Sequence, residues 1–277
     1  MRRLAVALLL LALATAACAD TPETLRLATT TSTYDSGLLD AILPQFEERS
    51  GAVVEVVAVG TGQALALGEA GDADVVLVHA RAREDAFVAA GLAPARYDVM
   101  YNDFVIVGPE DDPVGIADAP EVVEAFLWIA AAEARFASRG DESGTHSKEL
   151  SIWEMAGLVP DGDWYDSIGQ GMGSTLEFSQ ETGSYTLSDR GTFISQRANL
   201  EGMAILFGGA SIDENPDPGL LNPYGVLPVT GANEELAATF VIWLTSLETQ
   251  RAIADFRSPA GEALFFPDSA EWRSSGG

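Results

Sequence analysis

The sequence is short of basic residues, and this shortage excludes several classes of partner. Its 277 residues include 15 Lys and Arg but 42 Asp and Glu, which gives a formal net charge of −27, and Lys148 is the only lysine. A surface this acidic repels nucleic acid and anionic lipid headgroups, so we expect no nucleic-acid partner. The charge is also compatible with a solvated surface adapted to high salt, and it identifies no ligand by itself.

Cysteine and histidine are equally scarce. Cys18 is the only cysteine, so no disulfide can form within the chain. The two histidines, His79 and His146, form neither an H-x-H nor an H-E-x-x-H spacing, and we expect no metal site. The chain also lacks the G-x-S-x-G motif of a nucleophile elbow. A secreted hydrolase that uses Ser143 or His146 is the alternative from the enzyme class, but the sequence favours a protein that is not an enzyme.

Long apolar runs are absent except for one near the start. Residues 4–17 form an apolar stretch that follows two arginines and ends at Cys18. This layout is typical of a signal peptide, and the run is shorter than the ~20 residues that a membrane-spanning helix needs. The Thr-Ala-Ala-Cys of residues 15–18 resembles a bacterial lipobox; an ordinary cleavage site beside a cysteine is the alternative. We expect a signal peptide over residues 1–17 and a lipidated Cys18 that begins a linker over residues 18–24.

Apolar strand patterns alternate with helical patterns in the rest of the chain. Strands are predicted over residues 25–28, 53–59 and 74–78, with helices between them, and this order is typical of βαβ units and a parallel sheet. One long helix is predicted over residues 233–256. We expect an α/β protein of two lobes, each a mostly parallel sheet flanked by helices. Lobe one would comprise residues 25–103 plus 209–277, and lobe two residues 104–208.

Two loops rich in hydroxyl groups precede predicted helices. One covers residues 29–33, Thr-Thr-Thr-Ser-Thr, and the other residues 139–145, Arg-Gly-Asp-Glu-Ser-Gly-Thr. Unpaired N–H groups at a helix start suit an anion, and the planar fork of Arg139 matches an oxyanion. Each loop alone has a simpler interpretation: the hydroxyls are helix caps, and Arg139 forms a surface ion pair with Asp141. Facing each other across a cleft between lobes, the two loops would form an anion site.

Five motifs in this order resemble the substrate-binding protein family of tungstate ABC transporters. The similarity extends from about Leu25 to Pro259. The resemblance implies a two-lobed class II periplasmic-binding-protein fold that closes on a tetrahedral oxyanion. The motifs are residues 29–32 (TTTS), 60–64 (GTGQA), 102–109 (NDFVIVGP), 138–146 (SRGDESGTH) and 185–193 (YTLSDRGTF).

The resemblance also implies a set of ligand-binding residues. Arg190 belongs to a matching motif, and two roles are open for it: contact with the ion, or bracing of the cleft. The residues implied as ligands are Thr30 and Ser32 from lobe one, Arg139, Ser143 and Thr145 from lobe two, and Arg190.

These expectations combine into one functional hypothesis. The chain would be an extracytoplasmic, lipid-anchored, monomeric receptor that captures tungstate and delivers it to an ABC permease, with no cofactor. Alternatives within the same class are receptors for molybdate, sulfate or phosphate. Phosphate near neutral pH carries a proton that needs an acceptor, and Asp141 could supply one.

Overall fold

The computed structural model describes residues 22–215, 217–258 and 261–276. The predicted signal peptide and the predicted lipidation site at Cys18 lie outside these residues and stay predictions. Within the described part of the chain, no helix is long and apolar enough to cross a membrane.

Lobe one is built around a central strand, β1, which carries a parallel neighbour on each side. Leu27 of β1 lies opposite Val56 of β2 and Val75 of β3 in the two ladders. The connections run through helices, as the alternating pattern predicts, because parallel strands need a crossover between them. The elements are β1 (Thr24–Thr30), α1 (Thr31–Asp35), α2 (Leu38–Ser50), β2 (Val53–Val59), α3 (Thr61–Ala70), β3 (Val75–Val78) and α4 (Arg81–Ala89).

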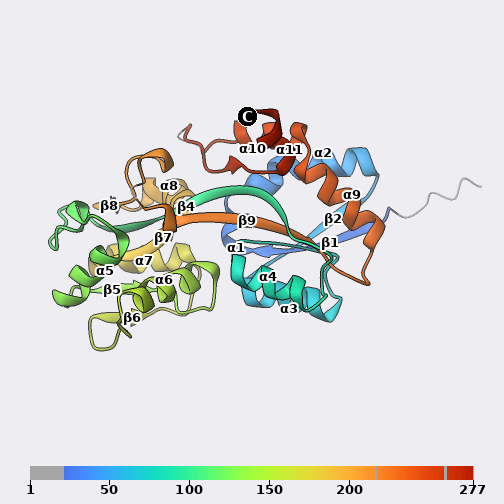
Figure 1. Cartoon of the computed structure of the whole chain (residues 1–277). Helices are drawn as coiled ribbons and strands as arrows, with labels where there is room; N and C mark the ends of the chain where they lie inside the picture. The colour runs from blue at the N-terminus through green and yellow to red at the C-terminus, as the bar shows by residue number, and fades with distance from the viewer. Residues whose placement is uncertain (1–21, 216, 259–260, 277) are drawn as a thin grey trace, which may run out of the picture.

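Two long antiparallel strands, β4 (Tyr97–Pro109) and β9 (Leu221–Pro228), connect the lobes (Figure 1). β4 pairs with β9 from Tyr97 to Asp103. From Phe104 onward it pairs with β7 and β8 of lobe two. The chain therefore passes from one lobe to the other inside a continuous strand. The remaining partners are β7 (Thr186–Asp189), β8 (Met203–Phe207) and β10 (Phe266–Pro267), which pairs with β4 in lobe one.

Lobe two contains a parallel pair beside these strands and is covered by four helices. Phe136 at the start of the parallel pair also forms a parallel bridge to Tyr185, which joins the pair to the strands around β4. The elements are β5 (Phe136–Ser138), β6 (Tyr165–Ser167), α5 (Val122–Ala131), α6 (Gly144–Met155), α7 (Met172–Thr182) and α8 (Arg190–Gln196).

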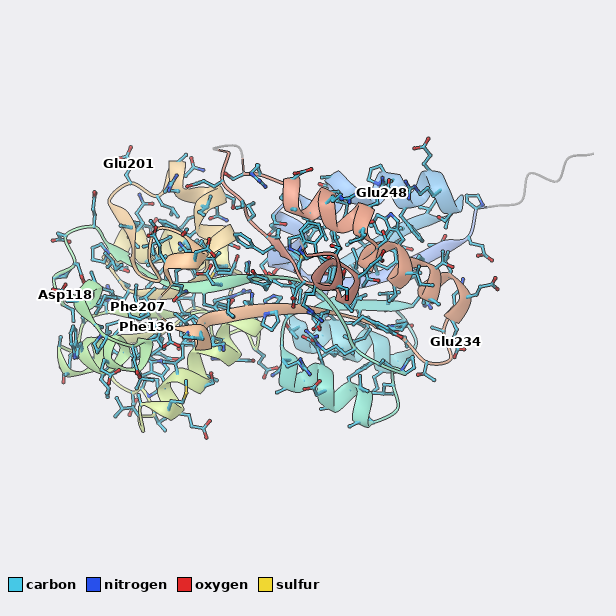
Figure 2. All side chains as sticks on the ribbon, turned by 45° about the horizontal axis from the view of Figure 1, so that its top comes forward. Asp118, Phe136, Glu201, Phe207, Glu234 and Glu248 are labelled. Atoms are coloured by element: carbon cyan, nitrogen blue, oxygen red, sulfur yellow. The ribbon has the colours of Figure 1, made fainter. Side chains whose placement is uncertain are left out.

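Separate aromatic clusters fill the cores of the lobes. In lobe one, the Phe46 ring lies 5.0 Å from Phe240 in an edge-on contact. In lobe two, the buried Trp153 ring lies 4.5 Å from Phe126 and 5.4 Å from Phe136. Figure 2 shows Phe136 well away from the lobe that contains the C-terminal helices. The division of the core follows the change of partners along β4, and the exact lobe boundaries remain a prediction.

The prediction of one long C-terminal helix is wrong, because the segment forms two helices. They are α9 (Glu234–Thr245) and α10 (Leu247–Asp255), followed by the short α11 (Ala270–Ser275). Ser246 between the first two has an extended ψ of 152°, and its hydroxyl accepts the Thr249 N–H. Serine competes with the helical backbone by capping the next helix, a tendency that the apolar periodicity does not reveal.

Candidate anion-binding site

The first hydroxyl-rich loop folds into a compact cluster at the end of β1. Thr30 caps α1, and its Oγ1 accepts the Thr33 N–H at 3.2 Å. The same oxygen lies 2.6 Å from Thr33 Oγ1 and 3.2 Å from Ser32 Oγ. All three side chains are buried, so the hydroxyls are held in fixed positions at the edge of lobe one. The simpler interpretation of this loop as a helix cap is thus correct for Thr30, but it leaves the Ser32 hydroxyl outside the cap.

His79, to which no sequence motif assigned a role in the site, joins this cluster from the end of β3. Its Nε2 lies 3.3 Å from Thr30 Oγ1 and 3.4 Å from Ser32 Oγ. Its Nδ1 lies 3.0 Å from Asn222 Oδ1, and its ring stacks on Tyr224 at 4.6 Å. Burial lowers the pKa of His79 to about 4, so the imidazole is neutral near pH 7. Since Nδ1 donates to the Asn222 carbonyl oxygen, Nε2 carries the lone pair.

The second loop folds around an ion pair between Arg139 and Asp141. Arg139 donates to Asp141 Oδ2 at 2.5 Å, and Asp141 Oδ1 accepts the Ser143 N–H at 3.1 Å. Ser143 caps α6 by accepting the His146 N–H at 3.2 Å. The Arg139 side chain is only 4% exposed and that of Asp141 is 17% exposed, so the pair is partly buried and differs from the expected surface pair. It still leaves Arg139 with donors that Asp141 does not use.

Three buried polar atoms near these loops have no hydrogen-bond partner in the described protein. They are Arg139 Nε, Thr145 Oγ1 and Thr61 Oγ1, and Thr61 is the first residue of α3. Each of the three residues is at most 4% exposed. A buried donor without a partner costs about 1–3 kcal/mol, so three of them in one region indicate a place where a ligand accepts hydrogen bonds. Thr61 lies in the motif of residues 60–64 but is not among the ligand residues that the resemblance implied.

A cavity of about 350 Å³ lies between the lobes at this point. Of the six predicted ligand residues, only Arg139 lines this cavity. Other residues of lobe one meet the second loop beside it: a Cβ placed on Gly60 would lie 3.9 Å from Asp141 O, and Arg83 donates to Glu142 O at 3.2 Å. The lining residues are Thr31, Gly60, Gly62, Gln63, Arg139, Asp141, Glu142, Gly169, Gln170 and Gly171.

The lining therefore brings few full charges to the cavity. Arg139 is balanced by Asp141, the exposed Glu142 adds one further acidic side chain, and the remaining polar groups are neutral hydroxyl, amide and backbone groups. Behind the second loop, Glu149 accepts hydrogen bonds from Ser138 at 2.7 Å and from Trp153 and Tyr165. Burial raises the pKa of Glu149 to about 7. An anion in this site would be held mainly by oriented dipoles and by the free donors of Arg139.

Arg190 lies apart from these groups and contacts the connection between the lobes. It donates to both carboxylate oxygens of Asp103 on β4, each at 2.7 Å. It also donates to the backbone oxygens of Gly208 at 2.5 Å and Gly209 at 2.9 Å, just after β8. Of the two roles that the sequence left open for Arg190, this geometry favours the brace.

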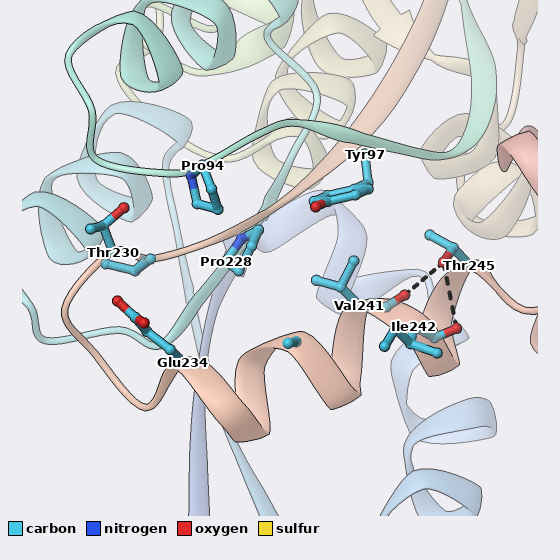
Figure 3. A pocket seen from close by; sticks show the side chains of 10 residues that line it. Pro94, Tyr97, Pro228, Thr230, Glu234, Val241, Ile242 and Thr245 are labelled. Atoms are coloured by element: carbon cyan, nitrogen blue, oxygen red, sulfur yellow. Dashed lines mark hydrogen bonds between the residues drawn. The ribbon is translucent and has the colours of Figure 1, made fainter.

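Two further features do not take part in the site. A second cavity, of about 420 Å³, lies in lobe one beside α9 and is lined by groups such as Tyr97, Val241 and Ile242 (Figure 3). Its apolar lining offers no cationic side chain to an anion. Among the described residues, no group of three or more His, Cys, Asp or Glu could hold a metal ion.

Comparisons with known proteins agree with this architecture. A model of the PBP superfamily domain matches residues 16–248. The tungstate-binding protein TupA of Peptoclostridium acidaminophilum is 44% identical over 285 residues, which cover 96% of this chain and 97% of that protein. The structure of the tungstate ABC transporter from Geobacter sulfurreducens is 48% identical, covers 84% of this chain and 99% of that chain, and has a TM-score of 0.75. The tungstate-binding protein TupA of Desulfovibrio alaskensis G20 is 44% identical, covers 89% and 99% of the two chains, and has the same TM-score.

These matches cover both lobes, so the similarity extends over the fold as a whole and both cleft-lining loops. They confirm the expected class II binding-protein architecture. The chain therefore belongs to the PBP superfamily and, within it, to the family of substrate-binding proteins of tungstate ABC transporters.

Proposed function

We propose that this protein is an extracytoplasmic receptor that binds tungstate between its two lobes and delivers it to an ABC permease. The observation that carries the proposal is the group of buried donors without protein partners, Arg139 Nε, Thr145 Oγ1 and Thr61 Oγ1, beside the interlobe cavity. A tetrahedral oxyanion offers four oxygen acceptors, which suits donors that converge from both lobes. The names of the relatives support tungstate as the anion.

The proposed ligand set follows the geometry. Arg139 and Thr145 would donate from lobe two, with Ser143 placing the first turn of α6. From lobe one Ser32 would donate, held in place by Thr30, together with Thr61 as an addition to the residues that the sequence implied. Binding would require no covalent chemistry, and hinge closure would replace the water around the ion with protein donors.

Phosphate is the alternative that depends most directly on Asp141. Hydrogen phosphate needs a hydrogen-bond acceptor, and Asp141 was the candidate. Both carboxylate oxygens of Asp141 already accept hydrogen bonds, from Arg139 and from the Ser143 N–H. Each oxygen keeps a second lone pair, so Asp141 could still accept a hydrogen bond from a protonated ligand, and the oxyanion panel below separates phosphate from tungstate.

Anchoring and delivery complete the proposal. Cys18 would carry a lipid after removal of residues 1–17, and residues 18–24 would link it to β1, which begins at Thr24. The protein would act as a monomer, with lobe one formed by residues 25–103 plus 209–277 and lobe two by residues 104–208. The closed form would dock on the permease.

Thermal unfolding with a panel of oxyanions tests the proposed ligand. The chain without residues 1–17 is heated with tungstate, molybdate, sulfate, phosphate or chloride at matched ionic strength. A ligand that binds only the folded state stabilises it by about 2.7 kcal/mol at 100 times its dissociation constant. We expect the largest rise in unfolding midpoint with tungstate. A midpoint that tungstate moves no more than chloride does would refute the proposal.

A further inference from the structure

His79 lies where the hydroxyl cluster of lobe one meets the first turn of α6 in lobe two. Gly144 begins α6, and a Cβ placed on it would lie 2.9 Å from Cε1 and 3.0 Å from Nδ1 of the His79 ring. Contacts below 3.0 Å require something to shift, so only glycine fits at this position. The His79 ring therefore lies between the hydroxyl cluster of lobe one and Gly144 of lobe two.

The ring itself has little freedom to move. Its Nδ1 contacts Asn222, which in turn donates to Asn102 Oδ1 at 2.7 Å. Tyr224 covers one face at 4.6 Å and accepts from Asn102 Nδ2 at 3.4 Å. Asn222, Asn102 and Tyr224 are each at most 2% exposed and lie on β4 and β9, the two connecting strands. A change in the position of His79 would require this whole network to move.

We propose that His79 is a positioning residue for oxyanion binding. Its Nε2 lone pair accepts the Thr30 hydroxyl proton and so leaves the neighbouring Ser32 hydroxyl free to donate to the anion. Its Nδ1–Cε1 edge receives Gly144 and so fixes how closely the lobes approach. No contact between His79 and the anion is part of this role. The inference rests on the proposed function, because it concerns the binding of the same ligand.

The contact with Gly144 predicts a specific non-additivity. Gly144→Ala places a methyl group against the ring, and overpacking of this kind weakens the closed form by roughly tenfold in tungstate affinity. His79→Ala removes the ring and makes room for the methyl group. In that background we expect Gly144→Ala to change the affinity by about twofold or less. A ring that only stabilised lobe one would leave the effect of Gly144→Ala unchanged.

A matched control separates contact with the ring from a general effect of alanine at a helix start. Gly173 lies in the first turn of α7, outside the residues that line the cavity, and its added Cβ would meet the Gln196 side-chain amide at 2.9 Å. That amide is the flexible end of a half-buried side chain and can move aside. Gly173→Ala should therefore bind tungstate as the parent does.

Two substitutions at position 79 test the contacts of Nε2 with the hydroxyl groups of lobe one. His79→Gln can place an amide oxygen near the position of Nε2, whereas His79→Leu has no acceptor there. We expect the Gln variant to retain most of the affinity and the Leu variant to lose about tenfold, as for a lost hydrogen bond to a binding group.

Titration calorimetry with sodium tungstate is measured on all variants, each checked for folding by its unfolding midpoint. Small-angle scattering with and without tungstate reports closure independently, and Gly144→Ala should be more extended than the parent in both conditions. Equal costs of Gly144→Ala with and without the ring, or parent-like affinity of His79→Leu, would overturn the inference. If the parent protein binds no oxyanion, the proposed function is refuted instead. The scattering comparison of Gly144→Ala with the parent would then still test the contact between His79 and Gly144.

Discussion

Replacement of Arg139 by lysine separates its proposed role as a ligand from its role in the ion pair. The guanidinium is 4% exposed, donates to Asp141 at 2.5 Å, and has a buried Nε without a protein partner. Lysine keeps the charge and can still pair with Asp141, but it loses the planar fork and the Nε donor. Arg139→Lys should therefore leave the ligand-free protein folded while removing a hydrogen bond to the anion.

The expected size of the effect follows from the kind of bond that is lost. Hydrogen bonds to charged groups contribute roughly 1.5–3 kcal/mol, which corresponds to about one to two decades in dissociation constant. Titration calorimetry with tungstate measures this directly, and the unfolding midpoint without ligand serves as the control. A lysine variant that binds tungstate with the parent's affinity would show that Arg139 makes no direct contact with the anion.

Asp141→Asn provides the opposite perturbation of the same pair. It leaves the Arg139 charge buried beside a neutral amide, and loss of one partner of a buried pair destabilises a protein by about 3–5 kcal/mol. The same change removes a negative charge from the edge of the cavity. We expect a lower unfolding midpoint without ligand but an affinity for tungstate that is equal or higher. If both quantities fell together, the carboxylate would be needed for binding itself.

Three further predictions concern other parts of the chain. Arg190→Met leaves the buried Asp103 carboxylate with a hydrogen bond from Asn215 but without its cationic partner, and should lower stability by about 3–5 kcal/mol. The tungstate affinity of the folded protein should change less, and an affinity loss at unchanged midpoint would instead favour the ligand role. The pKa of Glu149 is raised from its ordinary value of 4.5 to about 7, so the folded state holds a proton that the unfolded state releases, and the stability from this group is lost as pH rises through that window. Glu149→Gln should gain in midpoint over the parent between pH 4.5 and 7, and a constant difference across that range would contradict the shift. Cys18→Ser should release into the soluble fraction a protein that otherwise fractionates with membranes, and an unlipidated, soluble parent would rule out the anchor.

The sequence predicted the parts of the site that depend on local chain geometry. Hydroxyl groups before a helix are a local signal, and the structure does place Thr30 and Ser143 as caps of α1 and α6. The alternation of strands and helices likewise predicted the parallel strands of lobe one. These features arise within short segments, so a linear pattern is enough to indicate them.

The parts that the sequence did not predict depend on residues that are far apart in the chain. His79 acquires its environment from Asn222, 143 positions later, and Arg190 pairs with Asp103 across 87 positions. Residues that pair over such sequence separations leave no periodicity or short motif from which the pairing could be predicted. The break at Ser246 is different: it is local, but a single hydroxyl cap ended a helix whose apolar pattern continued. Competition between a cap and a helical backbone is decided by packing, which the pattern alone does not report.

The paired strands β4 and β9 also have a consequence for the entropy of binding. A connection made of flexible loops would let the lobes adopt many relative orientations, and ligand binding would have to remove that freedom. Here the connection is a hydrogen-bonded pair of strands, braced at Asp103 by Arg190, so the backbone torsions at the crossing are already restricted before any ligand arrives. Fixing one residue's backbone costs about 1–2 kcal/mol, and much of this cost is met when the protein folds. A small inorganic ion makes few contacts, so a receptor for it depends strongly on a scaffold whose connection between the lobes is already ordered.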